Sequence, residues 1–252
     1  MKSFNLISAL LVALFLTNCS GSGSGDDNPD GGQKVTIYSS ANFYSKTGEY
    51  TAPDIGTTVK VVGTNLTAQT TSNGLWEIPN VPVGEIDLEF TRDNMGTHII
   101  NNIDLNVGRE RVMVAGVLLA EKATATITSA TVEQGSGVLV VKLSTSPTPS
   151  STEKQFVTMF FGRDESVSNT KNEGYLKSNE ITQQNPTINI VPQVLSQYGF
   201  SSGETLYISL YTDSWWSNTH TNQYKLVYKY DEGYNFPNVN PNSRILLSIV
   251  IP

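Results

Sequence analysis

Apolar and polar residues alternate along the chain in short runs from Val35 onward. The clearest run places apolar side chains on one face and acidic side chains on the other: Glu85, Ile86, Asp87, Leu88, Glu89 and Phe90. A period of two residues predicts a half-buried β-strand, because successive side chains of a strand point to opposite faces. The longer period of an extended helix is missing, and only residues 192–198 favour a helical turn. The pattern predicts an all-β protein.

The strand pattern of residues 35–121 is divided by turn signals. Asn73-Gly74 lies between two β-forming runs. This dipeptide favours the tight turn of a β-hairpin, because both positions accept a positive φ. Pro79, Pro82 and Gly84 then mark a second reversal of the chain. Short strands joined by such turns are typical of a sandwich, so we predict a first β-sandwich domain over residues 35–121.

Three segments of this first domain resemble the carboxypeptidase regulatory-like domain: residues 57–62, 73–78 and 81–88. They share with it a turn-Gly-aromatic-x-Ile pattern and a Val-Pro-x-Gly pattern, here beginning at Gly74 and Val81. The resemblance implies a transthyretin-like β-sandwich that accompanies other domains and is non-catalytic. The wider fold group also includes starch-binding modules, so glycan binding is implied at the level of fold analogy.

Residues 122–252 predict a second β-sandwich. Runs of β-forming residues recur with loops between them, at 137–143, 156–161, 187–191, 205–212, 224–230 and 245–251. We expect the runs at 205–212 and 224–230 to pair with each other. Seven or eight strands of this kind favour a Greek key of the immunoglobulin or fibronectin type. An antibody-type domain is excluded, because its inter-sheet disulfide needs two cysteines and the chain has one.

The first 18 residues predict an export signal. Lys2 precedes an almost wholly apolar run from Leu6 to Leu16, which is too short to span a bilayer. Cys19 follows, and the order resembles a bacterial lipoprotein signal, in which the cysteine becomes the first mature residue and carries acyl chains. The alternative is an ordinary signal peptide followed by a free thiol. Residues 19–34 continue as a Gly/Ser/Asp-rich flexible linker.

Charge and linker composition bear on where the protein is located. The pair Asp26-Asp27 resembles the sorting signals that direct lipoproteins of the Bacteroidetes to the cell surface, which implies an outer-membrane location. The chain has 16 Lys and Arg against 23 Asp and Glu, a formal charge of −7. An acidic surface disfavours binding to nucleic acid and to anionic lipid. We therefore expect the membrane contact to be the N-terminal lipid anchor.

Nine aromatic residues lie between Tyr207 and Phe236. Two of them, Trp215 and Trp216, are adjacent in a polar stretch, so in an extended backbone their side chains point to opposite sides and one is expected to be exposed. An exposed ring among hydroxyl, amide and carboxylate groups suits stacking on a sugar. The candidate binding residues are Tyr211, Asp213, Trp215, Trp216, Asn218 and His220. The alternative interpretation is that the tyrosines line the sandwich core and one tryptophan closes its end.

The sequence offers few signs of catalysis. Its two histidines, His98 and His220, lie in different predicted domains, and neither belongs to a zinc-protease motif. Cleavage of a glycosidic bond by two carboxylates stays open, because any two acidic residues can meet in a fold. We predict a non-catalytic envelope protein, without metal or cofactor, that binds a glycan or an envelope partner through its C-terminal β-sandwich. The alternative is a structural subunit of an outer-membrane or surface complex.

Overall fold

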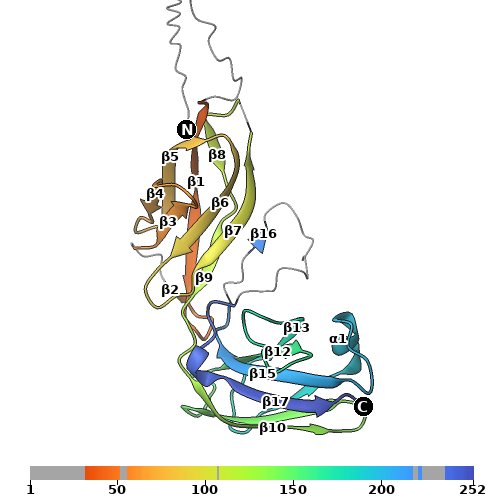
Figure 1. Ribbon diagram of the computed structural model, residues 1–252. Helices are drawn as coiled ribbons and strands as arrows, with labels where there is room; N and C mark the ends of the chain where they lie inside the picture. Colours follow the sequence, from red (N-terminus) through yellow and green to blue (C-terminus); the bar gives the residue numbers. More distant parts are fainter. Residues whose placement is uncertain (1–31, 52–55, 107, 218–220, 223–235) are drawn as a thin grey trace, which may run out of the picture. The chain divides into compact units, whose positions relative to one another are not determined.

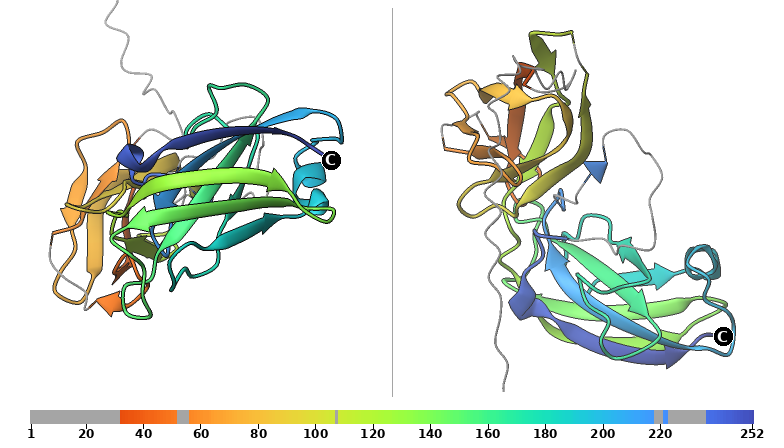
Figure 2. Two further views of the ribbon diagram at one scale, coloured as in Figure 1. Left: turned by 90° about the horizontal axis from the view of Figure 1, so that it is seen from below. Right: turned by 45° about the horizontal axis from the view of Figure 1, so that its top comes forward.

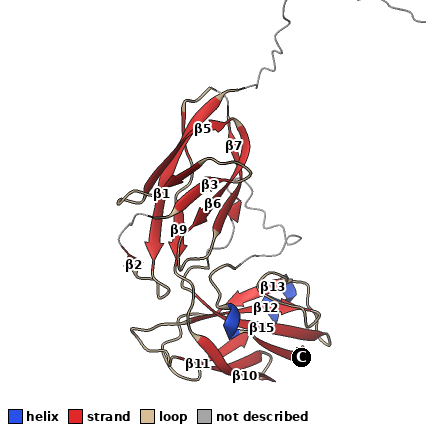
Figure 3. Ribbon diagram, turned by 60° about the vertical axis from the view of Figure 1, so that its left-hand side comes forward, coloured by secondary structure: helices blue, strands red, loops and turns tan. Residues whose placement is uncertain are grey.

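A computed structural model describes residues 32–51, 56–106, 108–217, 221–222 and 236–252, and residues 32–252 form one compact unit (Figure 1). The predicted export signal, Cys19 and most of the linker lie outside the described residues. So do Asn218, His220 and the predicted strand at 224–230. The prediction of an all-β fold is confirmed: strands dominate the described chain (Figure 3). The described chain also contains one short α-helix, α1 (Pro192–Gln197), where a helical turn was expected, and one 3-10 helix, η2 (Pro241–Ser243).

The first β-sandwich is organised around β1 (Lys34–Tyr44), which is long enough to pair with two shorter strands on each edge. One edge takes β5 (Leu75–Pro82) and β2 (Tyr50–Thr51), both antiparallel. The other edge takes β8 (Arg111–Met113) and β9 (Val117–Ala120), both parallel. The second sheet has the order β16 (Thr221–Asn222), β7 (His98–Leu105), β6 (Gly84–Thr91), β3 (Thr58–Val61) and β4 (Thr67–Gln69).

The apolar core of this sandwich follows the alternation read from the sequence. Leu88 and Phe90 of β6 are fully buried, and they pack in one cluster with residues of the first sheet such as Ile37, Phe43 and Trp76. The Trp76 and Phe90 rings meet edge to face with centroids 5.7 Å apart. The two-layer arrangement agrees with the sandwich that the family resemblance implies.

The turn at Asn73-Gly74 is present, but the expected hairpin is not. Gly74 has a φ of 71°, and its amide donates to the Thr71 carbonyl over 2.9 Å. The strands on either side, β4 and β5, belong to different sheets, because β4 pairs with β3 and β5 pairs with β1. The hairpin prediction was wrong because turn chemistry fixes a chain reversal without fixing the strand that each arm pairs with.

The second β-sandwich consists of a three-stranded and a four-stranded sheet. The first has the order β10 (Thr126–Gln134), β11 (Leu139–Ser146) and β14 (Thr187–Ile190). The second has the order β13 (Gly174–Lys177), β12 (Phe156–Gly162), β15 (Thr205–Asp213) and β17 (Ile245–Val250). Figure 2 shows β17, in dark blue, running beside β10, in light green, at one margin of the sandwich. This order is that of a Greek-key sandwich of the immunoglobulin and fibronectin class, as predicted.

The strand pairing of β15 corrects one expectation. Residues 207–210 of β15 pair with β12 on one edge and with β17 on the other, so this stretch has no free edge for a strand at 224–230. The expected pairing of 205–212 with 224–230 was wrong, because β12 and β17 are equally apolar partners from elsewhere in the chain.

Strand β12 is buried at every position, because both of its faces are covered. Val157, Met159 and Phe161 face the main core of the sandwich. Phe160 faces a smaller cluster on the other side of the sheet, with Val167, Tyr211, Phe236 and Val239. Part of the aromatic-rich stretch is therefore packing: the Phe160 ring lies edge to face against Tyr211 and Phe236, with centroids 5.6 and 4.8 Å apart.

The two sandwiches are in contact through buried amide side chains. Asn238 accepts from the Gly96 amide over 2.7 Å and donates to the Ala120 carbonyl over 3.0 Å. Asn240 and Thr212 both donate to the Ala125 carbonyl, over 2.7 and 2.6 Å. The segment between the sandwiches is therefore fixed on both sides. The predicted domain boundary at residue 121 stays a prediction, since residues 32–252 form one compact unit.

Candidate functional site

The two adjacent tryptophans lie in a tight turn directly after β15. We call residues 213–217 the tryptophan turn. Asp213 organises it from within: its Oδ1 accepts from the Ser214 amide over 2.7 Å. Its Oδ2 accepts from Thr158 Oγ1 over 2.7 Å and from Ser217 Oγ over 2.6 Å. A carboxylate with three hydrogen-bond donors is well satisfied although it is buried.

Lys177, the last residue of β13, forms hydrogen bonds with the same turn. Its ammonium donates to the Ser214 carbonyl over 2.5 Å, the Trp215 carbonyl over 3.1 Å and Ser217 Oγ over 2.8 Å. It also lies 3.3 Å from Asp213 Oδ2. Burial lowers the pKa of Lys177 below its ordinary value of 10.5, and the charge of Asp213 partly opposes this lowering.

Trp215 points toward the first sandwich. Its amide donates to the Lys46 carbonyl over 2.8 Å, and its ring lies 4.9 Å from the ring of Tyr44, centroid to centroid. The ring also lies against Gly48, where a Cβ atom would approach it to 2.6 Å. Only a residue without a side chain lets the tryptophan lie this close to the 45–49 turn. Trp215 is half-buried by these contacts.

Trp216 is the exposed member of the pair. Its residue surface is 37% exposed, and its ring centroid lies 6.1 Å from that of Trp215. Its carbonyl accepts from Asn238 Nδ2 over 2.6 Å, so its backbone is fixed while its side chain stays accessible. One exposed tryptophan was expected from the sequence, but the expected placement on opposite sides of an extended backbone is not found: residues 215–216 form a bend, and the two rings lie close together.

The predicted site residues thus have different surroundings. The structure brings Trp215, Trp216 and Asp213 together in one turn, but Tyr211 and Asp213 are buried and support the site rather than line it. Asn218 and His220 lie outside the described residues. Sequence reasoning missed Lys177 and Tyr44, since neither lies near the tryptophans in the chain. The aromatic character of the stretch from Tyr38 to Tyr50 was the one available signal.

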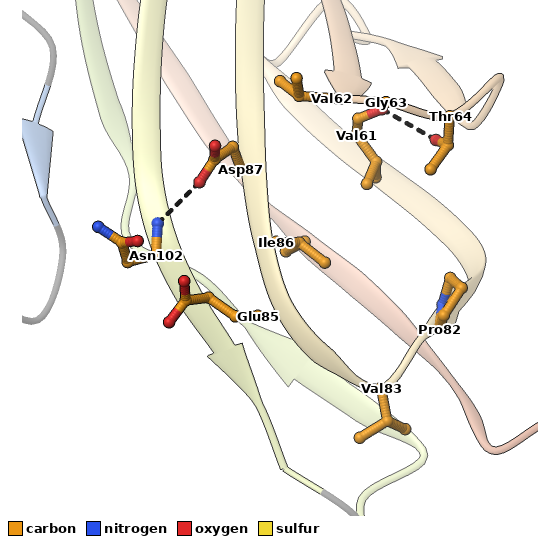
Figure 4. A pocket seen from close by; sticks show the side chains of 10 residues that line it. All are labelled: Val61, Val62, Gly63, Thr64, Pro82, Val83, Glu85, Ile86, Asp87 and Asn102. Atoms are coloured by element: carbon orange, nitrogen blue, oxygen red, sulfur yellow. Dashed lines mark hydrogen bonds between the residues drawn. The ribbon is translucent and has the colours of Figure 1, made fainter. Parts of the chain in front are cut away.

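A separate open pocket of about 390 Å³ lies on the first sandwich. Figure 4 shows Glu85, Asp87 and Asn102 on neighbouring strands, with Asp87 Oδ1 accepting from the Asn102 amide over 2.8 Å. The remaining lining is mostly aliphatic or backbone: Val61, Val62, Gly63, Thr64, Pro82, Val83 and Ile86. The residues of the described chain that line this pocket include no aromatic ring, so they offer no surface for stacking on a sugar.

No group of three or more His, Cys, Asp or Glu residues in the described chain is arranged to hold a metal ion. Likewise, the part of the chain that the structure describes contains no helix of the length and apolarity needed to cross a membrane.

Comparison with known proteins gave distant likenesses. No family model and no curated protein matches the chain. A candidate carbohydrate binding protein from Bacteroides uniformis is 14% identical, with 86% of this chain and 100% of that chain covered and a TM-score of 0.29. A DUF3823 family protein from Bacteroides ovatus is 10% identical, with 87% and 100% covered and a TM-score of 0.30.

A cohesin–X-dockerin complex from Acetivibrio cellulolyticus is 30% identical over 35% of this chain, with a TM-score of 0.30, and the match spans 58% of that chain's length. TM-scores this low identify no family and locate no site. We therefore base the function on the residues of the tryptophan turn.

Proposed function

We propose that this protein is a lipid-anchored protein of the cell envelope that binds carbohydrate, without cleaving it, at the tryptophan turn. The observation that carries the proposal is the exposed Trp216 side chain on a backbone fixed by Lys177, Asp213 and Asn238. A large flat apolar group at 37% exposure needs an explanation, and stacking on the apolar face of a sugar ring supplies one.

The rigidity of the turn supports a binding role. A ring on a flexible loop loses conformational freedom when a ligand stacks on it, and this loss weakens binding. Here the carbonyls of Ser214, Trp215 and Trp216 each accept a hydrogen bond from a side chain of another element. The ring of Trp216 is thereby presented in advance, and the entropic cost of binding is reduced.

The support for the proposed location comes from the sequence alone. The resemblance of residues 1–19 to a lipoprotein signal supports acylation at Cys19, and the acidic pair in the linker supports an outer-membrane protein exposed at the cell surface. Polysaccharides are abundant ligands at such a surface. The anchor and the binding turn together describe a protein that holds glycan near the membrane.

The test is a fluorescence titration of the full chain in detergent with a panel of soluble polysaccharides. We expect a saturable change in tryptophan emission, since Trp76 is buried in the first core and only Trp215 and Trp216 are accessible. Trp216→Ala should weaken binding about tenfold, the effect of losing roughly 1.4 kcal/mol of stacking.

The matched control is Met113→Ala, which removes an even more exposed apolar side chain from β8, on the first sandwich. It should leave the affinity unchanged. If Trp216→Ala binds every responding polysaccharide as tightly as the natural protein, the tryptophan turn is not the site. A copurifying envelope protein that survives loss of both tryptophans would favour the structural-subunit alternative instead.

A further inference from the structure

Four aromatic rings form a continuous row that extends from the tryptophan turn onto the first sandwich. Tyr50 of β2 meets Tyr44 of β1 with ring centroids 5.6 Å apart, and Tyr44 meets Trp215 at 4.9 Å. Trp215 meets Trp216 at 6.1 Å. We call Tyr50, Tyr44, Trp215 and Trp216 the aromatic row. Because β1 and β2 belong to the first sandwich, the row combines residues from both sandwiches.

Each ring of the row keeps accessible surface. The two ends are exposed, Tyr50 at 55% and Trp216 at 37%, and the two middle residues are half-buried. Elsewhere the described aromatic residues with large exposure are few, so this gathering is a distinct surface feature. A row of rings with open ends suits a ligand that is longer than a single sugar.

Strand pairing and backbone hydrogen bonds hold the aromatic row in place. Tyr44 and Tyr50 are directly opposite each other in the β1–β2 ladder, a position in which aromatic pairs stabilise a sheet. The turn between these strands is closed by hydrogen bonds of Ser45 with Glu49 and Gly48, over 2.8 and 3.0 Å. The hydrogen bond from the Trp215 amide to the Lys46 carbonyl then fastens the tryptophan turn to this same turn.

We propose that the aromatic row binds a single chain of a neutral polysaccharide along several consecutive sugar residues. This inference rests on the proposed function and specifies its ligand. Four rings in succession, with neighbouring centroids 4.9–6.1 Å apart, offer apolar surface to more than one sugar of an extended chain. The net charge of −7 disfavours an acidic polysaccharide.

The tilt between successive rings favours a single polysaccharide chain as the ligand over the flat surface of a crystalline polysaccharide. Successive rings make interplanar angles of 71°, 36° and 39°, so they do not lie in a common plane. The flat face of a crystalline polysaccharide touches several rings at once only when those rings are coplanar. A single chain in solution can twist from one sugar to the next and follow rings that turn. The row therefore selects soluble chains.

The experiment measures the affinity of the full chain in detergent for oligosaccharides of increasing length. The probes are the cello-, malto-, xylo- and manno-oligosaccharides from the disaccharide to the hexasaccharide, with microcrystalline cellulose as the insoluble probe. For the series that binds, affinity should rise with length until the chain covers the row. Tyr50→Ala should weaken binding of the hexasaccharide about tenfold and leave the disaccharide unchanged, because Tyr50 lies at the far end of the row.

Tyr50→Phe is the matched variant, since it keeps the ring and should keep the affinity of the hexasaccharide. Tyr50 is exposed, so both variants should fold. Equal affinity for disaccharide and hexasaccharide, an unchanged hexasaccharide affinity in Tyr50→Ala, or comparable binding to microcrystalline cellulose would each overturn this inference while leaving glycan binding intact. Absence of binding to every probe would overturn the proposed function, and this inference with it.

Discussion

Lys177 and Asp213 form a buried ion pair beneath the tryptophan turn, and each also bonds to backbone or hydroxyl groups of that turn. The side chain of Asp213 is fully buried, and that of Lys177 is about three-quarters buried. Such a pair contributes little net stability by itself, because desolvation of the charges offsets their attraction. The role of the pair here is to fix geometry, since its hydrogen bonds hold Ser214, Trp215 and Ser217 of the turn in one arrangement.

Lys177→Met should lower the free energy of unfolding by about 3 kcal/mol, because it leaves the Asp213 carboxylate buried without its counter-ion. Urea denaturation measures this effect. The matched control is Lys154→Met, which breaks the partly exposed ion pair with Glu180 and should cost less than about 1 kcal/mol. Equal costs for the two variants would show that the buried pair does not support the turn.

The same prediction has a pH signature. Because burial lowers the pKa of Lys177, the unfolded chain binds this proton more tightly than the folded protein between the lowered pKa and 10.5. Over that range the contribution of Lys177 to the free energy of unfolding should rise with pH. The difference between the natural protein and Lys177→Met isolates this group. A difference that falls with pH would show that the folded protein stabilises the charged ammonium instead.

At the scale of elements, the position of the aromatic row depends on the turn between β1 and β2. Gly48 in this turn has a φ of 91° and lies under the Trp215 ring. Both features require glycine: the first because side chains disfavour positive φ, the second because a Cβ atom would enter the space of the ring. The turn between β1 and β2 therefore packs closely against the Trp215 ring, although Gly48 and Trp215 are 167 positions apart in the sequence.

Gly48→Ala should destabilise the protein and shift the tryptophan emission, because the added methyl group displaces the Trp215 ring. Gly63→Ala is the matched control: Gly63 has a φ of 77°, but no atom lies within 4 Å of the added Cβ. The control should cost about 1 kcal/mol from backbone strain and leave the emission unchanged. A larger loss in Gly48→Ala, together with the spectral shift, measures the contact with Trp215. Identical behaviour of both variants would contradict that contact.

The sequence predicted elements better than it predicted their partners. Alternation in residues 85–90 located β6, because burial on one face leaves a period of two residues, and the apolar run at 156–161 located β12, because burial on both faces leaves a continuous run. The short β13 was missed, since four residues carry too little periodicity. Strand pairing was predicted wrongly at Asn73-Gly74 and for β15, because partners are chosen by the packing of the whole sandwich and local turn chemistry does not determine them.

The candidate site was predictable only in part, for a similar reason. Two adjacent tryptophans in a polar segment are visible in the sequence, and the exposure of one of them was expected, but the bend that brings their rings together was not. Tyr44, Tyr50 and Lys177 reach the turn from distant strands, and no spacing in the sequence connects them with it. The burial of Tyr211 likewise depends on Phe160 and Phe236, which cover it from a strand and a loop elsewhere in the chain.

At the scale of the whole molecule, the chain has a net negative charge and a predicted N-terminal lipid anchor. A net charge of −7 over the whole chain disfavours electrostatic attachment to anionic lipid, so in the proposed arrangement acyl chains at Cys19 would supply the membrane attachment. The Gly/Ser/Asp-rich composition of residues 19–34 predicts a flexible linker. With the proposed anchor, such a linker would keep the binding surface close to the membrane and let it reach a polymer above it.

Cys19→Ser should release the protein from the membrane fraction, because acylation contributes roughly 0.8 kcal/mol for each methylene group that enters the bilayer. Fractionation at low and high salt separates the two sources of membrane affinity. The natural protein should sediment with membranes at both salt concentrations, and Cys19→Ser should stay soluble at both. Ser20→Ala, which keeps the cysteine, is the matched control and should sediment. If Cys19→Ser sediments at low salt and is released at high salt, surface charges attach the protein to the membrane, and the role assigned to the acyl chains is wrong.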